Sequence, residues 1–202
     1  MTSAPELEFW FDFGSNYTYL AMMRIEHEAA RRGVRVAWRP FALGAIFKSF
    51  GWETSPFVLQ KAKGDYVWKD MERQCRKAGL PWHKPTSFPR SALLPLRVAL
   101  FGAQETWIGA FCRAIVSLNF ARDREIDEEP VVREALAALG VDAAPVIEAA
   151  TSPANKDALR AQTELARAIG IFGAPTFLVA GEMYWGNDRL DDALEAAALF
   201  RP

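Results

Sequence analysis

Two patterns of hydrophobic and polar positions divide the chain. Residues 6–13 and 34–41 are rich in the aromatic and β-branched side chains that favour strands. Residues 17–32 have apolar positions at helical spacing, and Gly33 follows where a helix is expected to end. This strand, helix and strand order predicts the opening of an α/β fold in which the first two strands pair in parallel.

Helical periodicity replaces the strand pattern from residue 44 to residue 170. Glycine and proline residues divide this long part into separate segments, because neither residue type is favoured inside a helix. The expected helices lie at 56–78, 89–102, 104–121, 127–138, 142–150 and 153–169. The segment contains no repeat and no flexible linker, so we expect it to pack tightly against the sheet.

Short strands return after residue 170. They are expected at 175–179 and 183–185, joined by a hairpin turn, and a helix at 189–200 closes the chain. We therefore expect a sheet domain formed by residues 1–43 and 171–202. Residues 44–170 would then be a large all-helical insertion between its second and third strands.

Composition and charge exclude several classes of partner. The chain has 202 residues, of which 50% are hydrophobic, and a net charge of −1, which suits a single packed domain with an insertion. No basic stripe is present, so nucleic acid is not an expected partner. The N-terminal segment lacks the basic start of a signal peptide, and no apolar run approaches the ~20 residues that cross a bilayer. We expect a cytoplasmic protein with no membrane partner.

The two cysteines indicate neither a disulfide nor a metal site. Cys75 and Cys112 have no cysteine or histidine at metal-ligand spacing, so no metal is expected. Cys112 lies in an apolar helix and is interpreted as a buried small side chain. Cys75 has Arg73, Arg76 and Lys77 nearby, and a solvated basic face is favoured over a thiol of lowered pKa.

Pro175 separates a helix end from a strand within residues 170–179. Two interpretations fit this local sequence equally. The bond from Ala174 to Pro175 is cis and lies beside an active site, or it is trans and Pro175 only begins a strand. The choice between them depends on which residues the N-terminal part of the chain places opposite Pro175.

Ser15 lies at the start of the first expected helix. Free backbone N–H groups at a helix start favour a nearby anion. A serine without a base is a poor nucleophile, and His27 lies about three turns along the same helix and cannot reach it. Ser15 is therefore interpreted as a hydrogen-bond donor to the thiolate of another molecule. The alternative is an ordinary N-cap serine.

Three stretches taken together resemble the kappa-class glutathione transferases and the 2-hydroxychromene-2-carboxylate isomerases. These families are thioredoxin-like and related to the periplasmic disulfide oxidases. The stretches are residues 11–20, where Asn16 replaces the usual proline, residues 63–70, and residues 172–177 with 185–190. The resemblance implies a thioredoxin-like fold, glutathione as the cofactor and a homodimer.

The resemblance also implies site residues. Ser15 would stabilise the glutathione thiolate, and the backbone of Ala174, before a cis Pro175, would pair with the tripeptide. The γ-glutamyl end would bind at Trp185, Gly186, Asn187 and Asp188, where the alternative is a turn with an Asp N-cap.

A helical face near residue 66 is expected to border the same cleft. Lys63, Tyr66 and Asp70 fall on one side of a helix, and the resemblance implies that Lys63 and Tyr66 face the ligand; the alternative is a solvated stripe. Family members commonly carry an asparagine in the preceding loop, where Thr54 would have to substitute. His83 is interpreted as structural. Aromatic candidates for a substrate wall are Trp38, Trp52, Phe57, Trp82 and Phe88.

The implied activity is a glutathione-dependent isomerisation in aromatic catabolism. The thiolate would add reversibly to a ring-opened aromatic pyruvate of the 2-hydroxychromene-2-carboxylate type and leave after bond rotation. Two alternatives stay open: a kappa-like glutathione transferase or peroxidase, and a non-catalytic glutathione-binding protein. A disulfide oxidoreductase is disfavoured, because position 15 carries no sulfur.

Overall fold

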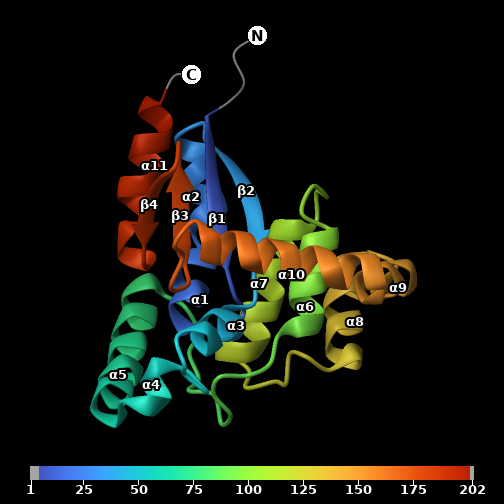
Figure 1. Ribbon diagram of the computed structural model, residues 1–202, viewed down its shortest axis with the longest axis horizontal. Helices are drawn as coiled ribbons and strands as arrows, with labels where there is room; N and C mark the ends of the chain where they lie inside the picture. The colour runs from blue at the N-terminus through green and yellow to red at the C-terminus, as the bar shows by residue number, and fades with distance from the viewer. Residues whose placement is uncertain (1–4, 201–202) are drawn as a thin grey trace.

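The computed structural model describes residues 5–200 and contains a four-stranded sheet in the order β2-β1-β3-β4 (Figure 1). β1 pairs in parallel with β2 and antiparallel with β3, and β3 pairs antiparallel with β4. The parallel opening and the closing hairpin are thus confirmed. The strands are β1 (Glu6–Phe11), β2 (Arg35–Pro40), β3 (Thr176–Val179) and β4 (Glu182–Trp185).

Helices follow the strands along the described residues, and those from α3 to α10 lie between β2 and β3 in sequence, as the expected insertion requires. The division into domains at residues 43 and 171 stays a prediction. The helices are α1 (Asn16–Met22), α2 (Ile25–Arg31), α3 (Leu43–Ser49), α4 (Pro56–Leu59), α5 (Lys61–Ala78), α6 (Leu93–Phe101), α7 (Ile108–Phe120), α8 (Glu129–Ala137), α9 (Ala143–Thr151), α10 (Pro153–Ala168), the 3-10 turn η1 (Asn187–Arg189) and α11 (Leu190–Leu199).

The expected continuous helix over residues 17–32 is wrong, because it breaks between α1 and α2. Arg24 leaves the helical conformation, with φ −123°, and its guanidinium binds Asn187 and Asp191 far along the chain. Such tertiary hydrogen bonds override local helix preference. The helix expected over 56–78 also divides, at Gln60, and α3 was not predicted from the sequence.

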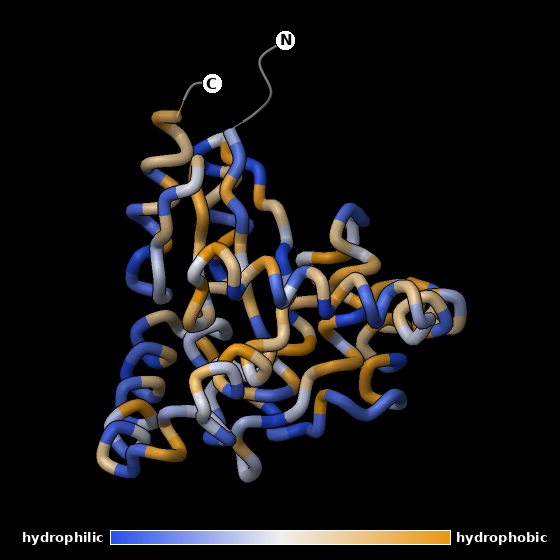
Figure 2. Tube along the Cα trace, viewed as in Figure 1, coloured by the Kyte–Doolittle hydropathy of each residue, from blue (hydrophilic) through white to orange (hydrophobic). Residues whose placement is uncertain are grey.

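The sheet has two apolar faces, because successive side chains of a strand point to opposite sides. Leu7, Phe9 and Phe11 of β1 enter a large core that also includes residues of α1, α2, α7 and α11. Trp10 enters a smaller core with α3 and α10, the first and last helices of the inserted segment. Figure 1 shows α10 running across the molecule below the strand labels, and Figure 2 shows the outer helix α5 as predominantly hydrophilic.

One sequence interpretation of a buried residue needs correction. Trp38 is 7% exposed and packs on Phe9 in the core, so it cannot form a substrate wall. Cys75 is fully buried and its basic neighbours are exposed, as the favoured interpretation expects; burial raises the pKa of its thiol to about 11 rather than lowering it. Cys112 is buried as predicted, and burial raises the pKa of its thiol as well.

Within residues 5–200, no helix combines the length and the apolar character that a membrane crossing requires. In the same range, no group of three or more His, Cys, Asp or Glu side chains is arranged to hold a metal ion.

Candidate active site

Ser15 and Ala174 meet at the centre of the candidate site, although they are 159 positions apart in sequence. The Ser15 Oγ donates a hydrogen bond of 2.7 Å to the Ala174 carbonyl oxygen. Ser15 has an extended backbone directly before α1, and its side chain does not cap that helix. The bond from Ala174 to Pro175 is cis. The cis interpretation is therefore confirmed, and the N-cap interpretation of the Ser15 side chain is wrong.

The loop that carries Ala174 is fixed by the sheet beside it. Gly186 N–H donates to the Pro175 carbonyl at 2.9 Å, and the Thr176 hydroxyl donates to the Gly173 carbonyl at 2.8 Å. Within residues 5–200, the Ala174 N–H makes no hydrogen bond of its own. A backbone N–H without a partner at this place can pair with an extended peptide.

Trp185 covers the same loop. Its indole lies so close to Gly173 that an added Cβ would clash with the indole Nε1, which explains why a glycine stands there. The indole is half-exposed and meets the Phe172 ring edge-on at 4.9 Å. An apolar surface therefore adjoins the Ala174 backbone.

Asn187 is held by Arg24, which the sequence did not identify. The Arg24 Nε donates to the Asn187 Oδ1 at 3.2 Å, and its Nη2 donates to the Asn187 backbone carbonyl at 2.7 Å. A guanidinium can only donate, so the Asn187 Oδ1 must face Arg24 and the amide Nδ2 remains available to a ligand. Asp188 is exposed and pairs with Arg189 at 3.1 Å. No local pattern marks Arg24, because its partners lie more than 160 positions away.

Tyr17 contacts the predicted ligand-binding face of α5. Its hydroxyl donates to Asp70 Oδ2 at 2.8 Å. Burial, and then this hydrogen bond, raises the pKa of Tyr17, and the charges of Tyr66 and Asp188 act in the same direction. The helix α1, which carries Tyr17, packs against both α5 and the η1 turn, and Tyr17 stays a neutral donor at physiological pH.

Lys63 lies beside an aromatic ring rather than beside an acid. Its Nζ is 5.8 Å from the centre of the Phe57 ring, which meets the Tyr17 ring at 6.4 Å. Tyr66, with 60% of its surface exposed, and Lys63 are both open to solvent. Phe57 is thus an aromatic candidate that the structure places near Tyr17.

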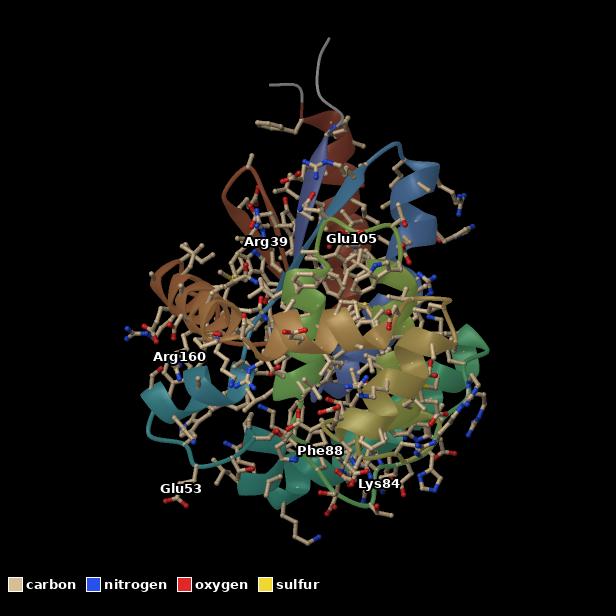
Figure 3. The ribbon with its side chains drawn as sticks, turned by 90° about the vertical axis from the view of Figure 1, so that its right-hand side faces the viewer. Arg39, Glu53, Lys84, Phe88, Glu105 and Arg160 are labelled. Carbon is tan, nitrogen blue, oxygen red and sulfur yellow. The ribbon has the colours of Figure 1, made fainter. Side chains whose placement is uncertain are left out.

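The other aromatic candidates form separate clusters. Trp52 packs with Phe47 and Phe50 beyond α3. Trp82 stacks between Trp68 and Phe120, and Phe88 meets Trp68 edge-on. The Lys84 and Phe88 loop lies at the lower end of the molecule in Figure 3. His83 lies in this loop and donates its backbone N–H to the Phe120 carbonyl, in keeping with a structural role.

Asp12 fixes the turn before Ser15. Its Oδ1 accepts from the Gly14 N–H at 2.7 Å, and its Oδ2 accepts from the Leu43 N–H at 2.8 Å, where α3 begins. Desolvation raises the pKa of Asp12 to about 6, against the effect of the two backbone donors. Asp12 therefore links the Ser15 turn to α3.

The comparisons with known proteins agree with this geometry. Residues 6–198 match the model of the DSBA-like thioredoxin domain, so the chain belongs to that family. It is 29% identical over 187 residues to a 2-hydroxychromene-2-carboxylate isomerase of Sphingobium xenophagum, covering 92% of this chain and 94% of the relative. It is 24% identical to glutathione S-transferase kappa 1 of Caenorhabditis elegans over 212 residues, covering 94% and 89%.

Solved structures give the same result. A 2-hydroxychromene-2-carboxylate isomerase superposes with a TM-score of 0.85 at 25% identity and covers 95% of this chain and 93% of the other. The cytosolic disulfide reductase DsbM of Pseudomonas aeruginosa with GSH has a TM-score of 0.66 at 18% identity, covers 94% and 96%, and shares the fold. The thioredoxin-like fold and the resemblance to the isomerases and kappa-class transferases are confirmed, and these names support an enzymatic role.

Proposed function

We propose that this protein is a glutathione-dependent isomerase acting on substrates of the 2-hydroxychromene-2-carboxylate type. The observation that carries the proposal is the 2.7 Å hydrogen bond between the Ser15 hydroxyl and the Ala174 carbonyl beside a cis proline. Relatives named for this isomerase activity match more than nine-tenths of the chain. A donor held against a peptide-binding backbone suits a ligand that is both a peptide and a thiol.

The residues present fit glutathione. The unpaired Ala174 N–H and its carbonyl offer both halves of a backbone pair, as an added strand requires. The Asn187 Nδ2 faces away from Arg24 and suits a carboxylate, and the Asp188 carboxylate suits an ammonium group. Together these groups match the cysteinyl backbone and the γ-glutamyl end of the tripeptide.

Ser15 would change its hydrogen-bond partner on binding. Its hydroxyl donates to the Ala174 carbonyl oxygen, and a peptide N–H of the ligand can replace it as the donor to that oxygen. The hydroxyl proton is then free to turn toward a sulfur. Because α1 has only seven residues, we assign the larger effect to the hydroxyl rather than to the helix. A hydrogen bond to the charged form of a group lowers its pKa.

Bound glutathione would supply a thiolate nucleophile for the conjugated carbon of a ring-opened aromatic pyruvate. Phe57 and the Tyr17 ring would line the aromatic side of the cleft, and Lys63, beside Phe57, would hold a carboxylate of glutathione or substrate. Tyr66, which is exposed on the same helix, would border the entrance. Trp185 would cover the peptide backbone at Ala174, next to Gly186.

A kappa-like glutathione transferase or peroxidase is the second candidate, supported by the relative from Caenorhabditis elegans. It would use the same Ser15 donor but join the thiolate to an electrophile. We also propose a homodimer, supported by large exposed apolar side chains of the inserted segment such as Phe101 and Leu165. Light scattering after gel filtration tests the dimer.

One experiment separates these functions. The protein is incubated with 2-hydroxychromene-2-carboxylate, with and without glutathione, and the absorbance of the conjugated product is followed. Turnover that requires glutathione without consuming it supports the isomerase. Retained glutathione binding without turnover, together with conjugation of a model electrophile, supports the transferase. Binding with neither reaction indicates a glutathione-binding protein without catalysis.

A further inference from the structure

Buried hydrogen bonds from the inserted helices hold the turn before Ser15, and the proposed chemistry does not use them. The Asn119 Nδ2, at the end of α7, donates to the Phe13 carbonyl at 3.0 Å. The Asn119 Oδ1 accepts from the Arg90 Nη1, also at 3.0 Å. Asn119 is 1% exposed and the Arg90 side chain is 1% exposed. A buried polar chain of this kind is costly unless every member is paired.

Arg90 is itself anchored by two acids. Its Nη2 pairs with Asp123 at 2.5 Å and its Nε with Glu125 at 2.8 Å. The backbone N–H of Thr86, and then Arg90, lower the pKa of Asp123 to about 2. Because a guanidinium only donates, Arg90 fixes which end of the Asn119 amide faces it. The amide nitrogen is thereby directed at Phe13.

The peptide group between Phe13 and Gly14 is also held at its N–H end. The Phe13 carbonyl and the Gly14 N–H belong to one planar peptide unit. Asn119 binds its oxygen at 3.0 Å, and Asp12 binds its N–H at 2.7 Å. A Cβ on Gly14 would lie 3.1 Å from the Arg90 carbonyl oxygen, so the turn also packs closely on the backbone of the loop that carries Arg90. The peptide plane that leads into Ser15 is therefore fixed at both ends.

We propose that Asn119, oriented by Arg90, is a positioning residue for Ser15. Together with Asp12 it fixes the orientation of the Phe13–Gly14 peptide. This orientation sets the direction from which the Ser15 hydroxyl approaches Ala174 and a bound sulfur. The inference rests on the proposed function and extends it, because it gives the inserted helices a part in thiolate stabilisation. Misplacement of a catalytic donor by about 1 Å is enough to weaken its effect strongly.

The test measures the pKa of the thiol of bound glutathione from its thiolate absorbance. In Asn119→Ala the turn loses its donor, and we expect that pKa to rise by about one unit, which is about a 10-fold change in the ionisation constant. S-methylglutathione, which has no thiol to ionise, should bind Asn119→Ala and wild type with equal affinity. A general loss of structure would instead raise the thiol pKa and lower the affinity for S-methylglutathione together.

Asn155→Ala is the matched control. The Asn155 Nδ2 also donates to backbone carbonyls inside the inserted helices, those of Arg97 and Ala150 at 3.0 Å each, but it does not contact the Ser15 turn. It should leave the thiol pKa unchanged. Should Asn119→Ala fail to fold, Asn119→Ser, which leaves space for a water molecule, makes the same test.

The outcomes separate the two proposals. A wild-type protein that shows no thiolate at neutral pH refutes the proposed function before any variant is compared. If wild type shows thiolate and the Asn119 variant has the same thiol pKa as wild type, the positioning inference alone is overturned. An equal rise in Asn155→Ala also overturns it, since the effect would then follow from any loosening of the inserted helices.

Discussion

Replacing Ser15 by alanine removes one oxygen at the centre of the candidate site. In the unliganded protein this deletes a neutral hydrogen bond to Ala174 of 2.7 Å. Such a bond contributes about 0.5–1.5 kcal/mol to stability. For a chain of this length the melting temperature should fall by roughly 2–4 °C for each kcal/mol. The variant should therefore remain folded at room temperature.

The effect on a bound thiolate should be larger. A hydrogen bond to a charged group contributes about 1.5–3 kcal/mol. Since one pKa unit corresponds to about 1.36 kcal/mol, the pKa of the bound glutathione thiol should rise by about 1–2 units in Ser15→Ala. The thiolate absorbance at neutral pH should fall accordingly, and turnover should fall with it.

The assay is a spectrophotometric pH titration of the complex, with Ser152→Ala as the control. Ser152 also has a bonded hydroxyl, which accepts from Asn155 N–H and donates to the Ala149 carbonyl at the start of α10. The control should lose stability without moving the thiol pKa. If Ser15→Ala titrates like the wild type while still binding glutathione, the assignment of Ser15 as the thiolate donor is refuted.

Three further predictions concern the surroundings of the site. Arg24→Gln should weaken glutathione binding about 3- to 10-fold, measured by calorimetry, because Asn187 loses its orienting donor. The thiol pKa should stay unchanged. An unaltered affinity would contradict the role given to Arg24. The folded-state pKa of Asp123 is about 2, so its ionisation stabilises the fold above pH 4, and this contribution is lost as the pH falls toward 2. Thermal unfolding should therefore be less acid-sensitive in Asp123→Asn than in wild type, and an equal sensitivity would count against the stabilisation of the Asp123 carboxylate by the Thr86 N–H and Arg90. Gly173→Ala should displace Trp185 and reduce glutathione affinity, and unchanged indole fluorescence would show that the packing there is looser than described.

The elements that the sequence predicted best are those whose local pattern and burial agree. β1 and β2 lie within one to two residues of the expected bounds, since their aromatic and β-branched residues line a buried sheet. The cis bond before Pro175 and the approach of Ser15 to it followed from the family resemblance and not from local propensity.

The elements that the sequence missed depend on distant partners. The break at Arg24 and the start of α3 at Leu43 are set by hydrogen bonds to Asn187 and to Asp12, which no window of local sequence contains. The same holds for Asn119, an unremarkable polar residue near the end of an apolar helix until Phe13 and Arg90 are placed beside it. Pairing across the fold, rather than residue type, gives these side chains their roles.

The contact between Ser15 and Ala174 has a consequence for the order in which the molecule can mature. Ser15 is synthesised 159 positions before Ala174, so a nascent chain that stops before Ala174 carries the Ser15 hydroxyl without this acceptor. A ligand that contacts both residues would bind only a chain in which these two segments have come together, and by mass action it would stabilise that arrangement. Occupancy would thus report completed folding.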